Sequence, residues 1–386
     1  MTTGDADPPV GDEVADVLRA AYYYALADGH HVVDPGHLLI AAARNDDRAG
    51  RVLGRRIADV RATMPQRGVP DTADDAGPTQ GGYAGALREA RWWVRRANPA
   101  AAQDGVPVWS GAVDAALARA AGAARAAGVT RLGIPHLLLG LLTSADPTVA
   151  ALADRVDLDI AVVRRHVEAV DLTAEPAPFA PLVDPLRAFG AAQSRGPWPI
   201  RWIPALMDRF TGRQDKWGGP VLACLEREVM RQAVVTGHDI VQSSCVLLAT
   251  VSLDVQLEAV GERLRAQYLP HNQGGGLLIE AGLDFAKAQS VAESLAEVEM
   301  ETLPTNESSA RFWDTGKPGD PSWSTAAASA MDQATSIGRQ HGRHDAGTTH
   351  LLAAALTEDS AAARLLANLG LDSEEIRYRA SQSITQ

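Results

Sequence analysis

Residues 29–39 read GHHVVDPGHLL, and the same pattern returns three more times along the chain. In each copy a glycine is followed eight residues later by a histidine, or once by a cysteine, and then by two apolar residues: 29–39, 128–138, 237–247 and 342–352. A pattern that recurs at a fixed interval is typical of a repeat protein. The sequence therefore predicts four copies of one structural unit.

An alanine-rich stretch precedes the repeated glycine, most clearly at 113–128 and 325–342. Alanine favours helix, and glycine ends a helix in the left-handed conformation without a Cβ penalty. The histidine then opens a second helix, and copy four shows two further short helices at 360–369 and 373–384. Each unit is thus predicted to hold four helices, and the fold class to be all-α.

A single unit offers a thin core, so we expect the units to pack in pseudo-twofold pairs. Seven prolines between 172 and 204 break regular structure and separate the two pairs. The expected organisation is a first domain at 1–172, with units near 10–65 and 107–171 and an insertion at 66–106; an exposed proline-rich linker at 173–204; and a second domain at 205–386, with units near 217–269 and 321–384 and an insertion at 270–320.

The charge balance restricts the possible partners. The 386 residues carry a net charge of −12, and such an acidic chain repels phosphate backbones, so no nucleic-acid partner is expected. No stretch approaches the roughly 18 apolar residues of a membrane span, and the N-terminus lacks a signal pattern. We therefore expect a cytoplasmic protein without membrane contact, whose two cysteines, Cys224 and Cys245, are buried free thiols.

Each insertion contains one charged helix. The pattern predicts a basic helix at 83–97 and an acidic helix at 285–302. Opposite charges allow the two halves to dock, and the alternative is two separate solvated faces. The sequence does not decide between them.

No catalytic motif is recognisable, so we predict a protein that is not an enzyme and carries no cofactor. The string closest to a phosphate-binding loop, 314–318, lacks the first glycine and has proline after Lys317. His341, His344 and His350 have a spacing that favours a metal site only weakly, because His350 is one of the repeated histidines. A residue that recurs in every unit indicates a structural role, such as packing or capping at the helix junction.

These residues resemble the Clp N-terminal repeat domain, the double four-helix module of Clp/Hsp100 unfoldases. The matching features are a glycine–histidine pair at Gly29 and Gly237, the sequence HLLLGLL at 136–142, and the segment 360–372. The resemblance covers about three quarters of the chain. Such unfoldases also carry AAA+ ATPase modules with a phosphate-binding loop, and because no such loop is recognisable here, we expect a Clp-repeat protein that stands alone, without those modules.

The resemblance also implies a peptide-binding groove beside the aromatic residue that precedes a unit's first helix. The corresponding residues are Trp109 and Trp323, with Val10 and Trp217 as the first-unit equivalents. A tryptophan offers a large contact area and an N–H donor. The alternative is that each ring only fastens its helix to the core.

In some relatives an acidic residue before the repeated histidine binds phosphorylated arginine. The equivalents here are not acidic, so this recognition is not expected: Gly36, Pro135, Ser244 and Thr349.

The function that these observations favour is non-catalytic binding. The expected ligands are peptides, adaptor proteins or peptide-like small molecules such as cyclic peptides, and a Clp ATPase is the expected partner. The protein would then act as an adaptor or decoy of a Clp unfoldase. The alternative is a structural or regulatory scaffold that has no Clp ATPase partner.

Overall fold

The structure is a computed structural model that describes residues 7–54, 57, 82–99, 106–144, 146–193, 218–302, 317, 319–343 and 345–385. It is predominantly helical, as predicted, with four two-residue strands in the described part. The chain divides into two compact units, Met1–Phe179 and Ala180–Gln386. The domain and repeat bounds proposed from the sequence stay a prediction.

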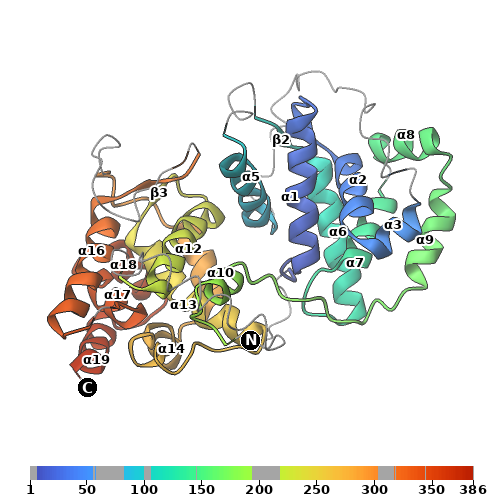
Figure 1. Cartoon of the computed structure of the whole chain (residues 1–386). Coiled ribbons are helices and arrows are strands. Elements are labelled where there is room, and N and C mark those ends of the chain that lie inside the picture. The colour runs from blue at the N-terminus through green and yellow to red at the C-terminus, as the bar shows by residue number, and fades with distance from the viewer. Residues whose placement is uncertain are drawn as a thin grey trace. The chain divides into compact units, whose positions relative to one another are not determined.

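The first unit contains copies one and two. Its helices are α1 (Asp12–Ala27), α2 (Pro35–Asn45), α3 (Asp47–Leu53), α5 (Ala84–Ala97), α6 (Gly111–Ala127), α7 (Ile134–Leu142), α8 (Pro147–Val156) and α9 (Ile160–Glu168), and its strands are β1 (Val32–Val33) and β2 (Val108–Trp109). Helix α1 packs between α2 and α5, and α6 packs on α7 (Figure 1).

The repeated glycines end their helices as predicted. Gly128 is the C-cap of α6 with φ 74°, and Gly237 takes the same position with φ 79°. Gly29 and Gly342 follow the ends of their helices with φ 70° and 69°. All four lie in the left-handed region that glycine adopts most easily.

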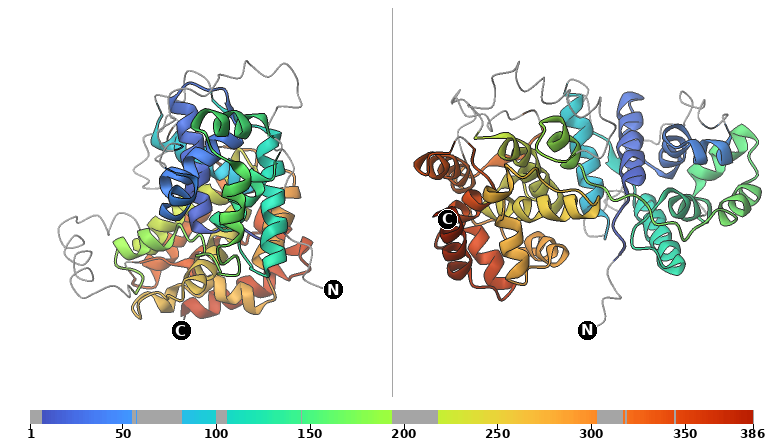
Figure 2. Two further views of the ribbon diagram at one scale, coloured as in Figure 1. Left: turned by 90° about the vertical axis from the view of Figure 1, so that its right-hand side faces the viewer. Right: turned by 60° about the horizontal axis from the view of Figure 1, so that its bottom comes forward.

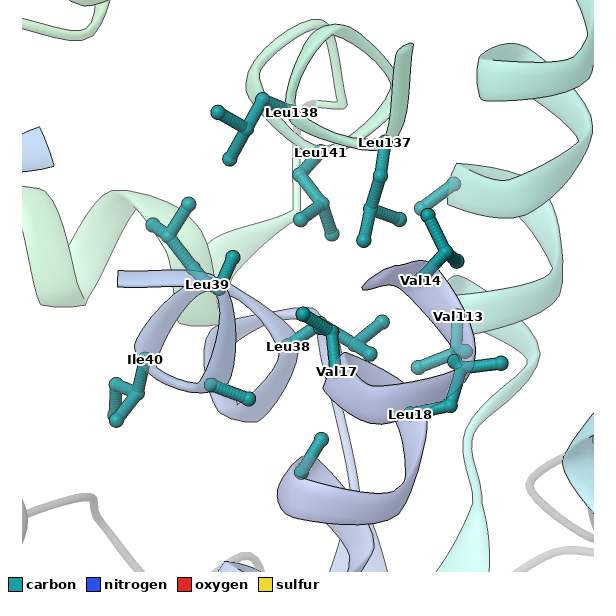
Figure 3. Packing of buried hydrophobic residues seen from close by; sticks show 14 of the residues in the cluster. Val14, Val17, Leu18, Leu38, Leu39, Ile40, Val113, Leu137, Leu138 and Leu141 are labelled. Atoms are coloured by element: carbon teal, nitrogen blue, oxygen red, sulfur yellow. The ribbon is translucent and has the colours of Figure 1, made fainter. Parts of the chain in front are cut away.

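The apolar pairs after the repeated histidine form the core. Leu38 and Leu39 of α2 and Leu137 and Leu138 of α7 are at most 3% exposed, and they meet Leu18 of α1. Figure 3 shows side chains of these three helices pointing toward one another. The repeat pattern therefore fills one continuous core between copies one and two.

Short parallel strands join the two copies reciprocally. Copy one pairs β1, after its glycine, with β2, before the first helix of copy two. Copy two pairs Leu132, after its glycine, with Val10, before the first helix of copy one. Each copy thus provides hydrogen-bonding partners for the backbone of the other. We call the first pairing the Trp109 junction and the second the Leu132 junction.

The second unit contains copies three and four. Its helices are α10 (Val183–Ala188), α12 (Pro220–Thr236), α13 (Ser243–Ala259), the 3₁₀ helix η4 (Leu269–His271), α14 (Gly274–Glu280), α15 (Phe285–Ser294), α16 (Thr325–Gln340), α17 (Thr348–Ala355), α18 (Ala361–Asn368) and α19 (Ser373–Thr385), and its strands are β3 (Ile240–Val241) and β4 (Ser322–Trp323). Helix α13 contacts six of the other helices, and α17 packs between α16 and α19 (Figure 2).

The same reciprocal arrangement joins copies three and four. Strand β3 pairs with β4 in parallel, which we call the Trp323 junction. The amide of Ala346 donates to the carbonyl of Gly218 at 2.7 Å, which we call the Gly218 junction. Reciprocal backbone pairing of two copies is therefore present in both units.

The described part of the predicted linker is more ordered than the prolines suggested. Helix α10 lies inside it, and the Leu182 amide just before α10 donates to Gln256 Oε1 at 2.8 Å. Arg187 binds Glu262 at 2.7 Å, and the Arg265 amide donates to Ala191 O at 2.9 Å. Residues 180–193 thus pack on the second unit, because these polar groups find partners there. Residues 194–204 lie outside the described part.

Among the described helices no single one is long and apolar enough to cross a membrane. Only α7 and α8 together satisfy the length and composition, across a bend of 97°.

Replacing Gly140 by alanine is expected to destabilise the first unit. A Cβ at Gly140 would lie 2.3 Å from Ala116 O and 2.8 Å from Ala120 N of α6, so α6 and α7 must move apart. We expect a loss of about 1–3 kcal/mol in the free energy of unfolding.

The matched control is Gly122→Ala within α6, where a Cβ meets nothing within 4 Å. It should stabilise the protein by about 0.5–1 kcal/mol, because alanine favours helix more than glycine does. Chemical denaturation followed by circular dichroism measures both. A Gly140→Ala protein as stable as wild type would contradict the close packing of α6 on α7.

Candidate functional site

The repeated histidines cap the second helix of their units. In α7 the Gly133 amide donates to His136 Nδ1 at 3.2 Å, and in α17 the Gly347 amide donates to His350 Nδ1 at 3.1 Å. His37 accepts from the Asp34 amide at 3.2 Å in the same way. Each ring satisfies an amide that the helix start leaves without a partner. The predicted capping role is confirmed.

Copy three has Cys245 in place of the histidine. Both Cys245 and Cys224 are buried and free, as expected. Burial raises the pKa of each thiol to about 12. Both remain neutral near pH 7, so neither has the thiolate that nucleophilic attack or metal binding requires.

The metal hypothesis rests on three histidines, of which His344 lies outside the described residues. Among the described residues no group of three or more His, Cys, Asp or Glu side chains is placed to hold a metal ion.

The Leu132 junction binds a segment of the chain itself, which we call the 171–178 strap and which turns at residues 172–174. Pro178 forms an antiparallel bridge with Gly11, and His136 Nε2 donates to Leu172 O at 3.0 Å. Glu175 accepts from the Thr130 amide at 3.0 Å and from Arg131 Nη1 at 3.0 Å. Burial raises the pKa of Glu175, but the hydrogen bonds from Thr130 and the charge of Arg131 outweigh it and lower that pKa overall.

The Trp323 junction binds a second segment, the 295–302 strap. Thr302 forms an antiparallel bridge with Ser324, which occupies the position of Gly11. Glu297 accepts from the Asp239 amide at 3.1 Å, and Asp239, like Thr130, is the second residue after a repeat glycine.

This strap corrects the predicted acidic helix at 285–302. Helix α15 ends at Ser294, and the glutamates beyond it lie on an extended chain. The carboxylates of Glu297 and Glu299 accept from amides and hydroxyls of the junction, and these donors are distant in sequence.

At the two other junctions, polar groups at the start of the second helix also have hydrogen-bond partners within the chain. At the Gly218 junction the Thr348 amide donates to Asn272 Oδ1 at 2.9 Å. At the Trp109 junction, His37 Nε2 lies 2.7 Å from His30 Nδ1, and its Nδ1 lies 2.9 Å from Asp34 Oδ1.

A cleft of about 290 Å³ lies beside the Leu132 junction. Its apolar lining comes from α3, α7 and α9, and charged groups stand around it: Glu13, Asp46, Arg48 and Arg51. Burial, then the charge of Asp46, raises the pKa of Glu13. A perturbed carboxyl in a cleft is a feature of binding sites.

A cleft of about 300 Å³ occupies the related place at the Trp323 junction. It is lined by α13, α18 and the strap residues Leu295, Ala296 and Val298. Pro135 lines the first cleft and Ser244 the second, and both directly precede the repeat position. The fold therefore forms related clefts at this position in both units.

The predicted tryptophans lie elsewhere. Trp109 is 4% exposed, its indole N–H donates to Leu87 O at 3.1 Å, and its ring lies 5.5 Å from that of Tyr22. Trp323 is 6% exposed. Neither ring lines the two clefts, so their positions favour the core-fastening alternative.

The first-unit equivalents differ as well. Val10 is half-buried and lines a small cavity of about 10 Å³. Trp217 lies outside the described residues. The residue 19 positions before the repeat glycine is Trp109 in copy two but Gly218 in copy three, so Gly218 rather than Trp217 takes that place.

Sequence reasoning missed the charged side chains of the first cleft. Glu13, Asp46, Arg48 and Arg51 belong to no motif, because the cleft is formed by four helices, some of them distant in sequence: α1, α3, α7 and α9. The feature of the sequence that does point to the clefts is the position directly before the repeated residue, which Pro135 and Ser244 occupy.

Comparison with known proteins identifies the last repeat. Residues 322–386 match the family model of the Clp repeat (R) N-terminal domain. The chain contains a Clp repeat N-terminal domain. The matched region is copy four, from β4 to α19, and the recognised resemblance is confirmed there.

Other comparisons add little. No curated protein matches the sequence. Three chains of solved structures match. One of them, from work described as "Preliminary structural investigations of a malarial protein secretion system", is 17% identical, with 41% of this chain and 92% of that chain covered and a TM-score of 0.25.

The capping role of His350 predicts a pH dependence of stability. Burial, with the nearby charges of His271 and Arg343, lowers the pKa of His350 to about 4. The unfolded chain, with a histidine pKa of about 6.5, then binds more protons than the folded protein below that pH. The free energy of unfolding should therefore fall as the pH drops from 6.5 toward 4.

His350→Gln should keep an acceptor for the Gly347 amide and remove this titration. Denaturation curves at several pH values should show that this variant loses less free energy of unfolding on acidification than wild type does. The control His166→Gln, at an exposed position of α9, should show the wild-type dependence of that free energy on pH. Equal slopes for all three proteins would contradict a buried neutral His350.

Trp109→Ala separates the two roles considered for this ring. Because the ring is buried and hydrogen-bonded, we expect the free energy of unfolding to fall by about 3–5 kcal/mol. Melting and peptide affinity should be measured on the same variant. Unchanged stability with lost affinity would instead support the groove hypothesis.

Proposed function

We propose that this protein binds extended segments of other proteins at the junctions of its paired repeats, without catalysis. In this proposal it serves as an adaptor or decoy of a Clp unfoldase. The Clp repeat domain at 322–386 supports the association with a Clp system.

The observation that carries the proposal is the pair of straps. The 171–178 strap follows the last helix of copy two, whereas the 295–302 strap lies in the insertion between copies three and four. Despite these different origins, each forms an antiparallel bridge to the residue before a first helix and places a glutamate on the amide two residues after a repeat glycine. The junction itself therefore favours an extended acidic segment.

The clefts supply room next to this main-chain site. An extended peptide gains affinity from main-chain hydrogen bonds and specificity from side-chain pockets. The first cleft combines an apolar floor with both signs of charge, which suits a peptide that alternates apolar and charged residues.

The first test uses an array of 12-residue peptides that together cover casein, a model unfolded substrate. Wild type is expected to bind a subset of them, and Val52→Trp, which fills the first cleft, should weaken that binding by about 1–3 kcal/mol. The control Ala161→Trp adds the same side chain at an exposed position of α9. The absence of any binding peptide would reject the proposal, and binding that Val52→Trp leaves unchanged for every peptide would reject the first cleft as the site.

The second test concerns the Clp partner. The protein is added to the Clp unfoldase and protease of its own cell while the degradation of a model substrate is followed. An adaptor should raise the degradation rate and a decoy should lower it. An unchanged rate with intact peptide binding would favour the scaffold alternative.

A further inference from the structure

The carboxylate of Glu299 is enclosed at the Trp323 junction. Oε2 accepts from the Ser243 amide at 2.8 Å and from Ser324 Oγ at 2.9 Å. Oε1 accepts from Ser243 Oγ at 2.5 Å and from the Ala361 amide at 2.9 Å. Each oxygen thus has two donors, and they come from the starts of three helices. We call these four donors the carboxylate cradle.

The two hydroxyls of the cradle are held by backbone amides as well as by Glu299. Ser243 Oγ accepts from the Ala362 amide at 3.0 Å, and Ser324 Oγ accepts from the Ala327 amide at 3.0 Å. Because these amides occupy hydroxyl lone pairs, each O–H is left to donate toward the carboxylate. The amides of Ser243 and Ala361 add the positive ends of α13 and α18. The cradle is therefore preorganised for an anionic oxygen pair.

The strap that carries Glu299 buries little apolar surface. Val298 is 37% exposed and Met300 is 61% exposed, and both are large apolar side chains at the surface. None of the residues 295–302 is fully buried. The strap is held mainly by polar contacts, such as the amide of Val298 on Gln242 Oε1 at 3.0 Å. Segments with few buried apolar contacts open locally at low cost.

The related positions of the first unit lack this cradle. At the Leu132 junction, Gly11 stands where Ser324 lies, and Ile134 stands where Ser243 lies. At the Trp109 junction, Pro35 and Pro147 begin α2 and α8 without an amide hydrogen. The repeat fold alone therefore does not require the cradle.

We propose that the 295–302 strap is a built-in ligand that closes the Trp323 junction, and that an acidic extended peptide of a partner protein displaces it. This inference rests on the proposed function and names its ligand class at this junction. The cradle selects the carboxylate. Two further groups bind the peptide main chain. Gln242 Oε1 accepts from the Val298 amide, and the Thr325 amide donates to Glu301 O at 2.7 Å.

The test uses a fluorescein-labelled synthetic peptide with the sequence of residues 295–303, LAEVEMETL, and the full-length protein. Fluorescence anisotropy should show at least ten-fold tighter binding to Glu299→Ala than to wild type, whose own strap competes. Adding Ser243→Ala to that variant should remove the gain. Glu301→Ala, which changes an exposed glutamate of the same strap, should behave as wild type.

The chemistry of the ligand is tested with two further probes. A peptide with glutamine in place of its central glutamate should bind at least ten-fold more weakly to Glu299→Ala. Free glutarate or phosphate, added at the same concentration as the peptide, should not displace the bound peptide. Equal binding of the glutamine peptide, or full competition by either free anion, would overturn the proposal of an acidic peptide site.

If Glu299→Ala does not fold, hydrogen exchange of the wild-type protein tests displacement instead. Saturating peptide should speed the exchange of the strap amides of Val298 and Glu299, and unchanged exchange would overturn displacement. The Val52→Trp variant distinguishes the two proposals, because it changes only the first unit. If the casein peptides bind wild type and bind Val52→Trp more weakly, while LAEVEMETL never displaces the strap, this inference fails and the proposed function stands.

Discussion

The reciprocal strand pairing is the constraint on which the rest of the structure depends. Backbone amides and carbonyls near a buried helix start need partners, and two consecutive helices of one repeat do not supply them all. Here the Val108 amide donates to His31 O at 3.0 Å and the Leu132 amide donates to Pro9 O at 2.9 Å, so each copy completes the other. This pairing brings the first helix of one copy against the second helix of its partner. The straps and the two clefts lie at or beside the Leu132 and Trp323 junctions that this pairing forms.

The sequence predicted the parts of the fold that depend on local chemistry. The interval from glycine to histidine located the left-handed ends at Gly128 and Gly237 and the caps of His136 and His350. It also located the apolar pairs of the core. Each of these depends on a few neighbouring residues, and a pattern of neighbouring residues is what a single sequence displays.

The parts that escaped prediction depend on distant donors and acceptors. The acidic run after Ser294 has helical composition, but Glu299 finds its donors on residues 56 and 62 positions away along the chain. The segment around α10 was expected to be an open linker, yet Gln256 and Glu262 hold it. For the same reason the charged lining of the first cleft could not be found: Glu13 and Arg51 belong to different helices and share no motif.

The fusion of two repeats in one chain has an evolutionary consequence. A lone repeat of this kind can close its open edges only by pairing with an identical copy, and a twofold dimer then carries the same residues at both junctions. Within a fused chain that identity is no longer enforced. Gly11 and Ser324 occupy one and the same structural position, and one is bare backbone while the other orients a carboxylate. Four copies thus provide four junctions on one scaffold, and the residues of each can change independently of the others.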